Sequence, residues 1–206
     1  EITWRDWSSD VCSSDLHMNK TTVLASSSPR RIEMLQKSGF NPIIHPADID
    51  ETLPKNILPR DAVMFLSLKK ALSVAELFPD NTVIIAADTV VSNNGILGKP
   101  SDEKDAEKML MSLSGHPHEV LTGVTVLETG TPHIDTFCDV TKVFVADFSS
   151  RDISRYVMSD EPYDKAGGYA IQGWFGRFIT DIDGDYDNVV GLPLRRLTRL
   201  LQEKYI

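Results

Sequence analysis

The sequence predicts a single α/β domain in which helices flank a mixed, largely central β-sheet. Val83 to Ala87 form a continuous apolar run of strand length, which is typical of a strand buried on both faces. From Val120 to Val126 apolar and β-branched residues recur at every second position, which is the period of a strand. Apolar residues at helical spacing separate such strands, and no internal repeat or linker divides the chain.

The first 17 residues are expected to lie outside this domain. Asp6 to Leu16 show no hydrophobic period and resemble the translation of a sequencing-library adapter. Residues 1–17 are therefore interpreted as a non-native, disordered segment, and a native disordered tail is the alternative. They also lack the basic start and apolar core of a signal peptide. The domain is expected to span 18–206, with Met18 as its natural start.

The first half of the domain is expected to contain two strands and two helices before the apolar run. Residues 21–25 form a strand, and a helix follows that ends at Gly39. A short strand at 42–45 precedes a long helix at 60–77. An apolar stripe of that long helix is expected to face the core and consists of Phe65, Leu68, Leu72 and Ala75.

The apolar strand is expected to end at Asp88-Thr89, with a hairpin-type turn at 93–95. Pro100-Ser101 are expected to cap a helix that ends at Gly115. Two long strands, at 120–126 and 136–147, should then form an antiparallel pair. The later elements are a helix capped by Ser150, a glycine-rich loop at 161–176, a strand at 178–182 and a last helix opened by Pro193.

Composition excludes several classes of protein. The chain of 206 residues carries a formal charge of −9, and an acidic protein is a poor general binder of nucleic acid. Cys138 is the single cysteine of the expected domain, which favours a reducing cytoplasm over a disulfide framework. No run of about 18 apolar residues occurs, so no membrane span is expected.

The junction Ser26 to Arg31 is the first candidate site. A strand there runs through three serines into a helix start, where unpaired backbone N–H groups and the helix dipole suit an anion. Arg30 and Arg31 add planar donors that match phosphate oxygens. An ordinary helix cap would give the same pattern, so the junction alone leaves both interpretations open.

Charged residues at element ends give further candidates. Asp88, with Thr89, follows the buried strand, where a carboxylate often binds a metal or acts as a base. Lys99 lies in a Gly-Lys-Pro turn, and Lys70 interrupts the long helix beside its apolar stripe. Taken alone, Lys70 is better explained as a solvated lysine whose stem lies along the helix, and Glu51 as a solvated surface carboxylate.

The segment Asp164 to Gly173 is the last candidate. Its glycines allow a ligand to approach the backbone closely, and the Gln172 amide could read the edge of a base. A flexible surface loop is the plain alternative. The chain has no Walker-type lysine loop, no zinc-type Cys/His cluster and no nucleophilic serine elbow, and His116 and His118 are interpreted as structural. Carboxylates, lysines and arginines together favour metal-assisted hydrolysis of a phosphoanhydride.

Five segments in this order resemble the Maf family of nucleoside triphosphate pyrophosphatases. They are Leu24 to Arg31, Ala87 to Val91, Gly98 to Pro100, Asp164 to Gly173 and Val190 to Leu194. The resemblance runs from about residue 21 to the C-terminus, and its specificity comes from the combination. One departure is Gly168, where relatives often carry alanine.

The resemblance implies a Maf/ITPase-like fold and cleavage of a nucleoside triphosphate to the monophosphate and pyrophosphate. It places catalytic roles on Asp88, Glu51, Lys70 and Lys99. It places substrate binding on Ser28, Arg30, Arg31, Thr89, Lys165 and Gln172. It also implies a divalent cation, Mg²⁺ or Mn²⁺, held by Asp88 and Glu51, and a cytoplasmic homodimer with no nucleic-acid or membrane partner.

Within the family, Arg30, Thr89 and Gln172 resemble the branch that acts on dTTP and UTP. Ser28 and Arg31 are expected to hold phosphate, while Arg30 shares in choosing the base. Two alternatives stay open: a nucleotide-binding regulator of cell division without turnover, and a pyrophosphatase for 7-methyl-GTP or another modified nucleotide. The intact set of Asp88, Lys99 and Arg30 argues against the regulator.

Overall fold

The computed structural model describes residues 20–205, so the interpretation of residues 1–17 lies outside the described part of the chain. One mixed sheet runs through this part, with the strand order β2-β1-β3-β5-β6-β7 and β4 paired with β3. The strands are β1 (Thr21–Leu24), β2 (Ile43–Ile44), β3 (Thr82–Ser92), β4 (Ile96–Leu97), β5 (His118–Glu128), β6 (Ile134–Val145) and β7 (Ile179–Asp183).

The helices are α1 (Pro29–Lys37), α2 (Pro59–Ala75), α3 (Glu103–Leu113), α4 (Ser150–Val157), α5 (Tyr186–Val190) and α6 (Leu194–Lys204), with the 3-10 turns η2 (Ala166–Gly168) and η3 (Trp174–Phe178). Strands β2, β1 and β3 run parallel, and all other pairs are antiparallel. The expected mixed α/β architecture is confirmed. No helix in the described range is both long and apolar enough to cross a membrane.

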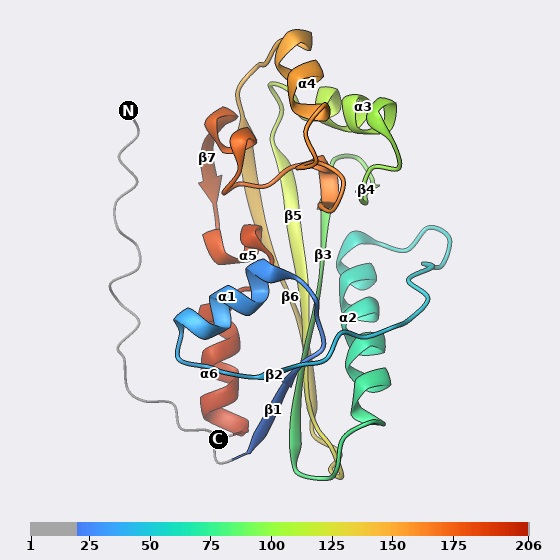
Figure 1. Ribbon diagram of the computed structural model, residues 1–206, viewed down its shortest axis with the longest axis vertical. Coiled ribbons are helices and arrows are strands. Elements are labelled where there is room, and N and C mark those ends of the chain that lie inside the picture. Colours follow the sequence, from blue (N-terminus) through green and yellow to red (C-terminus); the bar gives the residue numbers. More distant parts are fainter. Residues whose placement is uncertain (1–19, 206) are drawn as a thin grey trace.

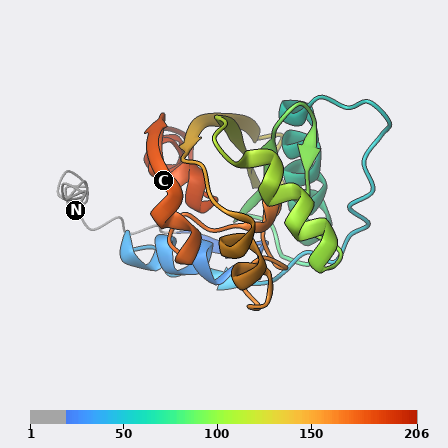
Figure 2. The ribbon, with the colours of Figure 1, turned by 90° about the horizontal axis from the view of Figure 1, so that it is seen from above.

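Helices cover both faces of the sheet (Figure 1). Helix α2 packs on one face, where Ala71 and Val74 meet Val23, Ile84 and Ala86. Helices α1 and α6 pack on the other face, and the residues of that core include Leu24, Leu35, Val83, Ile85, Ala87, Leu197 and Leu201. Residues 45–58 lead into α2 and project from the body of the protein beside it (Figure 2).

The two-residue period of β3 decides which face each of its side chains meets. Ile84 and Ala86 belong to the core under α2, and Asp88 continues the same series. Ile85 and Ala87 belong to the core under α1 and α6, and Thr89 continues that series. Neighbouring residues of one strand therefore deliver a carboxylate to the α2 face and a hydroxyl to the α1 face.

Helix α2 approaches the sheet closely at Gly123, the β5 residue paired with Asp88. A Cβ on Gly123 would lie 2.3 Å from the Val63 carbonyl oxygen, so only glycine fits beneath the helix here. This close contact explains how a side chain two turns further along α2 can reach Asp88.

The expected apolar stripe of α2 was wrong. Phe65 and Leu72 are exposed, whereas Val63, Leu66 and Val74 are buried. Helix α2 is apolar on more than one face, so hydrophobic spacing alone did not identify the side that meets the sheet.

Three further expectations need correction. The strand that contains Asp88 does not end there but continues to Ser92, paired with β5 throughout. The cap of α3 is Asp102 rather than Pro100-Ser101, and the cap of α4 is Ser149 rather than Ser150, since these side chains accept the N-terminal amide hydrogen bonds. The short helix α5, capped by Asp185, was not expected.

Candidate active site

A cleft of about 680 Å³ opens where β1 ends while its neighbour β3 continues. The last parallel contact joins the Ala25 amide to the Ile85 carbonyl. Beyond it, the chain leaves β1 through Ser26–Ser28, so the edge of β3 at Ala87 to Val90 becomes part of the cleft wall. Asp88 therefore lies within β3, next to the point where the neighbouring strand β1 ends.

The cleft brings together every site residue expected from the sequence. These residues are Ser28, Arg30, Arg31, Glu51, Lys70, Asp88, Thr89, Lys99, Lys165 and Gln172. Asp164 also lines the cleft, so five cationic side chains face three carboxylates there. The charge balance of the cleft is therefore positive in a chain whose formal charge is −9, which suits a polyanionic ligand.

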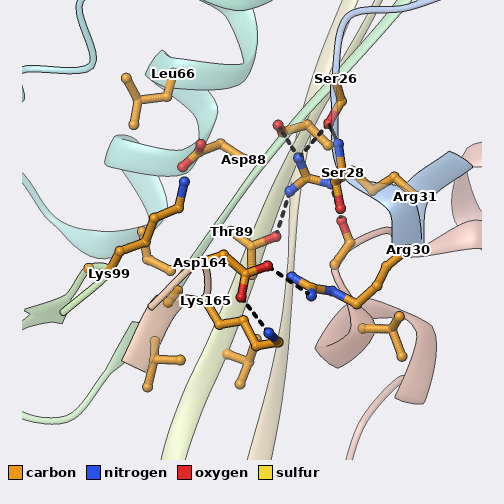
Figure 3. A pocket seen from close by; sticks show the side chains of 18 of the residues that line it. Ser26, Ser28, Arg30, Arg31, Leu66, Asp88, Thr89, Lys99, Asp164 and Lys165 are labelled. Carbon is orange, nitrogen blue, oxygen red and sulfur yellow. Dashed lines mark hydrogen bonds and ion pairs between the residues drawn. The ribbon is translucent and has the colours of Figure 1, made fainter. Parts of the chain in front are cut away.

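Lys70 joins the two carboxylates on the α2 side of the cleft. Its Nζ lies 2.6 Å from Asp88 Oδ1 and 2.7 Å from Glu51 Oε1. Asp88 and the Lys70 side chain are largely buried, whereas about half of the Glu51 side chain is exposed. Lys99 extends toward Asp88 from the β4 side (Figure 3). The interpretation of Lys70 as a solvated lysine is therefore wrong, because the side chain turns inward to a pair of carboxylates.

The environment keeps Glu51 ionised. Burial by itself would raise the pKa of Glu51, but the hydrogen bond and charge of Lys70, with help from Lys99 and Arg31, outweigh burial and hold that pKa below its ordinary value. Glu51 therefore presents a carboxylate, rather than a carboxylic acid, to whatever occupies the cleft.

The junction between β1 and α1 lies at the edge of the cleft. Helix α1 begins at Pro29, and Ser28 at its cap makes no side-chain hydrogen bond to the helix. The Ser28 amide instead donates to Ser26 Oγ over 3.2 Å. The Ser28 hydroxyl and the first turn of α1 thus stand at the edge of the cleft, where the helix dipole favours an anion.

The Arg31 side chain forms most of its hydrogen bonds within the protein. Its guanidinium donates to the Gly191 carbonyl at 2.8 Å, the Ala87 carbonyl at 2.9 Å, Ser26 Oγ at 3.2 Å and Thr89 Oγ1 at 2.9 Å (Figure 3). Burial lowers the pKa of Arg31, and the nearby Asp88 carboxylate opposes that effect. With most of its donors used, Arg31 joins β1, β3 and the turn after α5. This geometry favours a positioning role over the expected role as a main phosphate ligand.

A buried polar network continues from Thr89 across the sheet. Thr89 Oγ1 lies 2.9 Å from Thr122 Oγ1, which donates to the Asn188 carbonyl over 3.0 Å. The Asn188 amide in turn donates to Thr141 Oγ1 and to the Val120 carbonyl. Hydrogen bonds that involve β5, β6 and α5 therefore fix the Thr89 hydroxyl in the wall of the cleft.

Arg30 and Lys165 approach the cleft from opposite elements and share Asp164. Arg30 Nη1 lies 3.7 Å from Asp164 Oδ2, and Lys165 forms an ion pair with the same carboxylate (Figure 3). Lys165 also donates to the Glu161 carbonyl over 2.7 Å. Arg30 keeps most of its donors free of the protein partners described, so it is better placed than Arg31 to bind a ligand.

Sequence reasoning gave no role of their own to Ser26 and Asp164, which lie within two of the candidate segments, and it missed Thr122 and Asn188, which support the cleft from behind Thr89. Asp164 lies within a segment that the sequence had identified as functional. The neighbouring Lys165, with which it forms an ion pair, could have pointed to it. The sequence around Thr122 and Asn188 gives no such signal, because these two buried side chains acquire their hydrogen-bond partners only when β5 and α5 come together. His118 is buried and bonded to Tyr169, as its structural interpretation expects.

Three protein ligands for a metal do not come together anywhere in residues 20–205. Asp88 and Glu51 do present carboxylate oxygens to one common point, where the Lys70 ammonium now lies. Mg²⁺ is commonly held by one or two carboxylates together with substrate phosphates. The second oxygen of each carboxylate, which is not bonded to Lys70, fits an ion whose coordination the substrate completes.

Residues 21–204 match the sequence model of a family described as Maf-like protein. A dTTP/UTP pyrophosphatase of Lachnoclostridium phytofermentans is 46% identical over 179 residues, which are 85% of this chain and 90% of that protein. The dTTP/UTP pyrophosphatase of Exiguobacterium sibiricum is 45% identical over 181 residues, 87% of this chain and 90% of that protein. A relative of the same name from Koribacter versatilis is 42% identical over 87% of this chain and 92% of its own length.

One solved structure resembles the fold weakly. A nucleoside-triphosphatase / dITP/XTP pyrophosphatase from Mycobacterium abscessus aligns with a TM-score of 0.40 and 10% identity, over 62% of this chain and 75% of that one. This likeness is too slight to bear on the site.

Proposed function

The chain belongs to the Maf-like protein family, and from this premise we propose that it hydrolyses dTTP and UTP to the nucleoside monophosphate and pyrophosphate. Relatives named for that activity share 42% to 46% identity with it over most of their length. The structural observation that carries the proposal is the cleft at the end of β1, which is lined by the Lys70–Asp88 ion pair and by four further cationic side chains.

The cations would bind the triphosphate and offset its charge. Arg30 on α1, Lys99 in the loop after β4 and Lys165 in the loop before η2 line the cleft from three separate segments, so they can reach different phosphoryl groups at once. The first turn of α1 and the Ser28 hydroxyl add neutral donors on the same side as Arg30. Hydrolysis between the α- and β-phosphates adds negative charge to the departing pyrophosphate, and fixed cations favour that change in the transition state.

Asp88 would orient the attacking water and accept its proton. The carboxylate is largely buried, and one oxygen is held by Lys70 at 2.6 Å, which leaves Oδ2 for the water. Attack at the α-phosphorus forms a new P–O bond to the monophosphate and breaks the bond to the bridging oxygen, so pyrophosphate leaves. Lys70 holds the Asp88 carboxylate in place between turnovers.

A divalent cation, Mg²⁺ or Mn²⁺, is part of this proposal. When bound with the substrate, it would polarise the phosphoryl oxygens and help to order the water. Asp88 and Glu51 are the residues that would hold it, through the carboxylate oxygens that are not bonded to Lys70. Glu51 must be ionised to bind this cation, and its lowered pKa keeps it in that form.

Gln172 is proposed to read the pyrimidine. Its exposed amide carries both a donor and an acceptor at the rim of the cleft, which is the pattern that the paired carbonyl and N–H of thymine or uracil require. A cytoplasmic location and a homodimer stay predictions from the sequence resemblance.

The test is a substrate panel on the purified chain. Pyrophosphate release from dTTP, UTP, CTP, GTP and 7-methyl-GTP should be measured with Mg²⁺ and with Mn²⁺. We expect release from dTTP and UTP, and a loss of about 100-fold or more in Asp88→Asn. No release from either nucleotide by the folded protein would refute the substrate assignment. Near-full activity of Asp88→Asn would refute the role of Asp88.

A further inference from the structure

The segment 164–173 holds two of the proposed substrate-binding residues, Lys165 and Gln172, on very little regular structure. Its only element is the 3-10 turn η2, whose middle residue Gly167 has a positive φ of 68°. Side chains on such a segment keep their positions only if contacts with rigid elements hold the backbone. Those contacts therefore bear directly on substrate binding.

One set of contacts places the middle of the segment against β3. The Gly167 amide donates to the Gly98 carbonyl over 2.9 Å. A Cβ on Gly167 would lie 2.8 Å from Val91 Cγ2, so the Gly167 backbone packs directly on the Val91 side chain of β3. Two residues later, Tyr169 turns its side chain into the protein and its ring lines the cleft.

The second set of contacts joins Tyr169 to β5. Its hydroxyl lies 2.6 Å from His118 Nε2, and both side chains are buried. The Tyr169 ring also packs on Phe175, with ring centroids 4.7 Å apart. Within residues 20–205, Nδ1 of His118 makes no hydrogen bond of normal geometry, so the contact with Tyr169 is the main polar interaction of the imidazole.

The protonation states and the tautomer of His118 together give this hydrogen bond its direction. Burial lowers the pKa of His118 to about 4, with the His116 backbone opposing the effect, so the imidazole is neutral at physiological pH. Burial raises the pKa of Tyr169, so the phenol keeps its proton. The phenol donates and His118 Nε2 accepts in the tautomer that carries its proton on Nδ1, and this tautomer turns its N–H toward the His116 backbone.

We propose that His118 is a positioning residue, which accepts the Tyr169 hydrogen bond and thereby fixes the 164–173 segment with Lys165 and Gln172 over the cleft. His118 itself does not line the cleft, so its effect on the reaction passes through Tyr169. The inference rests on the proposed function, because it assigns the segment to binding of dTTP and UTP.

The test compares the substrate kinetics of two variants that break the bond. Tyr169→Phe and His118→Phe should each raise KM for dTTP about fivefold, the effect of one lost hydrogen bond, with kcat within about twofold of the parent. Binding groups that contact substrate and transition state equally change KM in this way. The preference for dTTP over CTP should fall in both variants, since Gln172 loses its fixed position.

Two further variants separate positioning from simple loss of stability. His118→Gln keeps an acceptor at the same reach and should restore most of the parent KM. Tyr205→Phe is the matched control, because Tyr205 is also buried and its hydroxyl donates to the Val126 carbonyl over 2.9 Å in the core between α6 and the sheet. This control should lower the unfolding temperature while leaving KM and base preference unchanged.

The inference is wrong if Tyr169→Phe and His118→Phe lower the unfolding temperature, as Tyr205→Phe does, but keep the parent KM and base preference. It is also wrong if His118→Gln behaves like His118→Phe. Failure of the proposed function would appear differently, as absence of dTTP and UTP turnover in the parent protein itself.

Discussion

The ammonium of Lys70, on helix α2, lies 2.6 Å from the carboxylate of Asp88, on strand β3. This ion pair links the helix that covers one face of the sheet to the strand at the floor of the cleft. It exists because the two-residue period of β3 turns Asp88 toward α2, and because Gly123 lets α2 come close enough to deliver Lys70.

Replacing Lys70 tests this arrangement. In Lys70→Met the aliphatic stem remains, but Asp88 and Glu51 lose the cation between them. We expect kcat/KM for dTTP to fall on the order of 100-fold, as when one preorganised charged group is removed from an active site. The variant should remain folded by circular dichroism. Activity within about threefold of the parent would show that Lys70 is dispensable.

The pH dependence of the same variant gives a second prediction. Lys70 is the main group that lowers the pKa of Glu51, so Lys70→Met should raise it. A carboxylate with a lowered pKa stays ionised to lower pH, and activity that needs it is lost only as the pH falls through that pKa. The acid limb of the profile of kcat/KM against pH should therefore move to higher pH in Lys70→Met. An acid limb at the same pH in both proteins would show that the ionisation of Glu51 does not control activity.

Arg31→Lys should destabilise the fold more than Arg30→Lys does. Arg31 donates to four acceptors on three parts of the chain, and a lysine cannot reproduce that planar set of donors. We expect a loss of about 3 kcal/mol in the free energy of unfolding, typical of a broken buried polar network. Among residues 20–205 Arg30 makes one ion pair, at 3.7 Å, so Arg30→Lys should cost less than about 1 kcal/mol. Urea denaturation measures both, and equal losses would contradict the positioning role of Arg31.

Gly123→Ala should reduce activity from a position outside the cleft. The new Cβ would overlap the Val63 carbonyl, and a backbone neighbour can yield only if α2 moves away from the sheet. We expect a loss of about 1–3 kcal/mol in stability, as in other overpacked cores, together with a lower kcat because Lys70 moves from Asp88. The two effects are read from urea unfolding and from dTTP turnover at a temperature where the variant is fully folded. A destabilised variant with the parent kcat would show that α2 does not set the Lys70 position.

His118 gives the protein an acid-sensitive contribution to stability. A histidine has a pKa near 6.5 in the unfolded chain, whereas burial lowers the pKa of His118 to about 4 in the folded protein. Between these values the unfolded state binds the proton and the folded state does not. Stability from this group is therefore complete above about pH 6.5 and is lost as the pH falls toward 4.

The comparison that isolates this effect is the parent protein against His118→Gln. The parent should lose more unfolding free energy between pH 7 and pH 4.5 than the variant, by an amount on the order of 3 kcal/mol at most. Equal pH dependence in the two proteins would show that His118 is solvated and titrates normally.

The sequence was informative wherever chemistry lay in contiguous segments. The Ser26–Arg31 junction, Asp88-Thr89 and the 164–173 segment were identified from local pattern, and all of them line one cleft. Lys70 and Glu51 were weak candidates, because their significance depends on a helix face and a loop path that only tertiary packing decides. The buried face of α2 was misassigned for the same reason.

The role of Arg31 shows a second limit. An arginine at a helix start suggests an anion site whether its donors point to a ligand or to the protein. Its partners Ala87 and Gly191 are backbone carbonyls 56 and 160 residues away in the sequence, and any residue type supplies a carbonyl. No sequence pattern distinguishes such an acceptor. Only the structure could show that Arg31 bonds within the protein while Arg30 keeps donors for a ligand.

The most direct test of the proposed reaction follows the oxygen of the attacking water. Hydrolysis of dTTP in ¹⁸O-labelled water, with the products separated and analysed by mass spectrometry, identifies the phosphorus that is attacked. Attack at the α-phosphorus, with water oriented by Asp88, predicts one ¹⁸O atom in dTMP and none in pyrophosphate. Label in pyrophosphate, or release of orthophosphate with dTDP, would contradict the account.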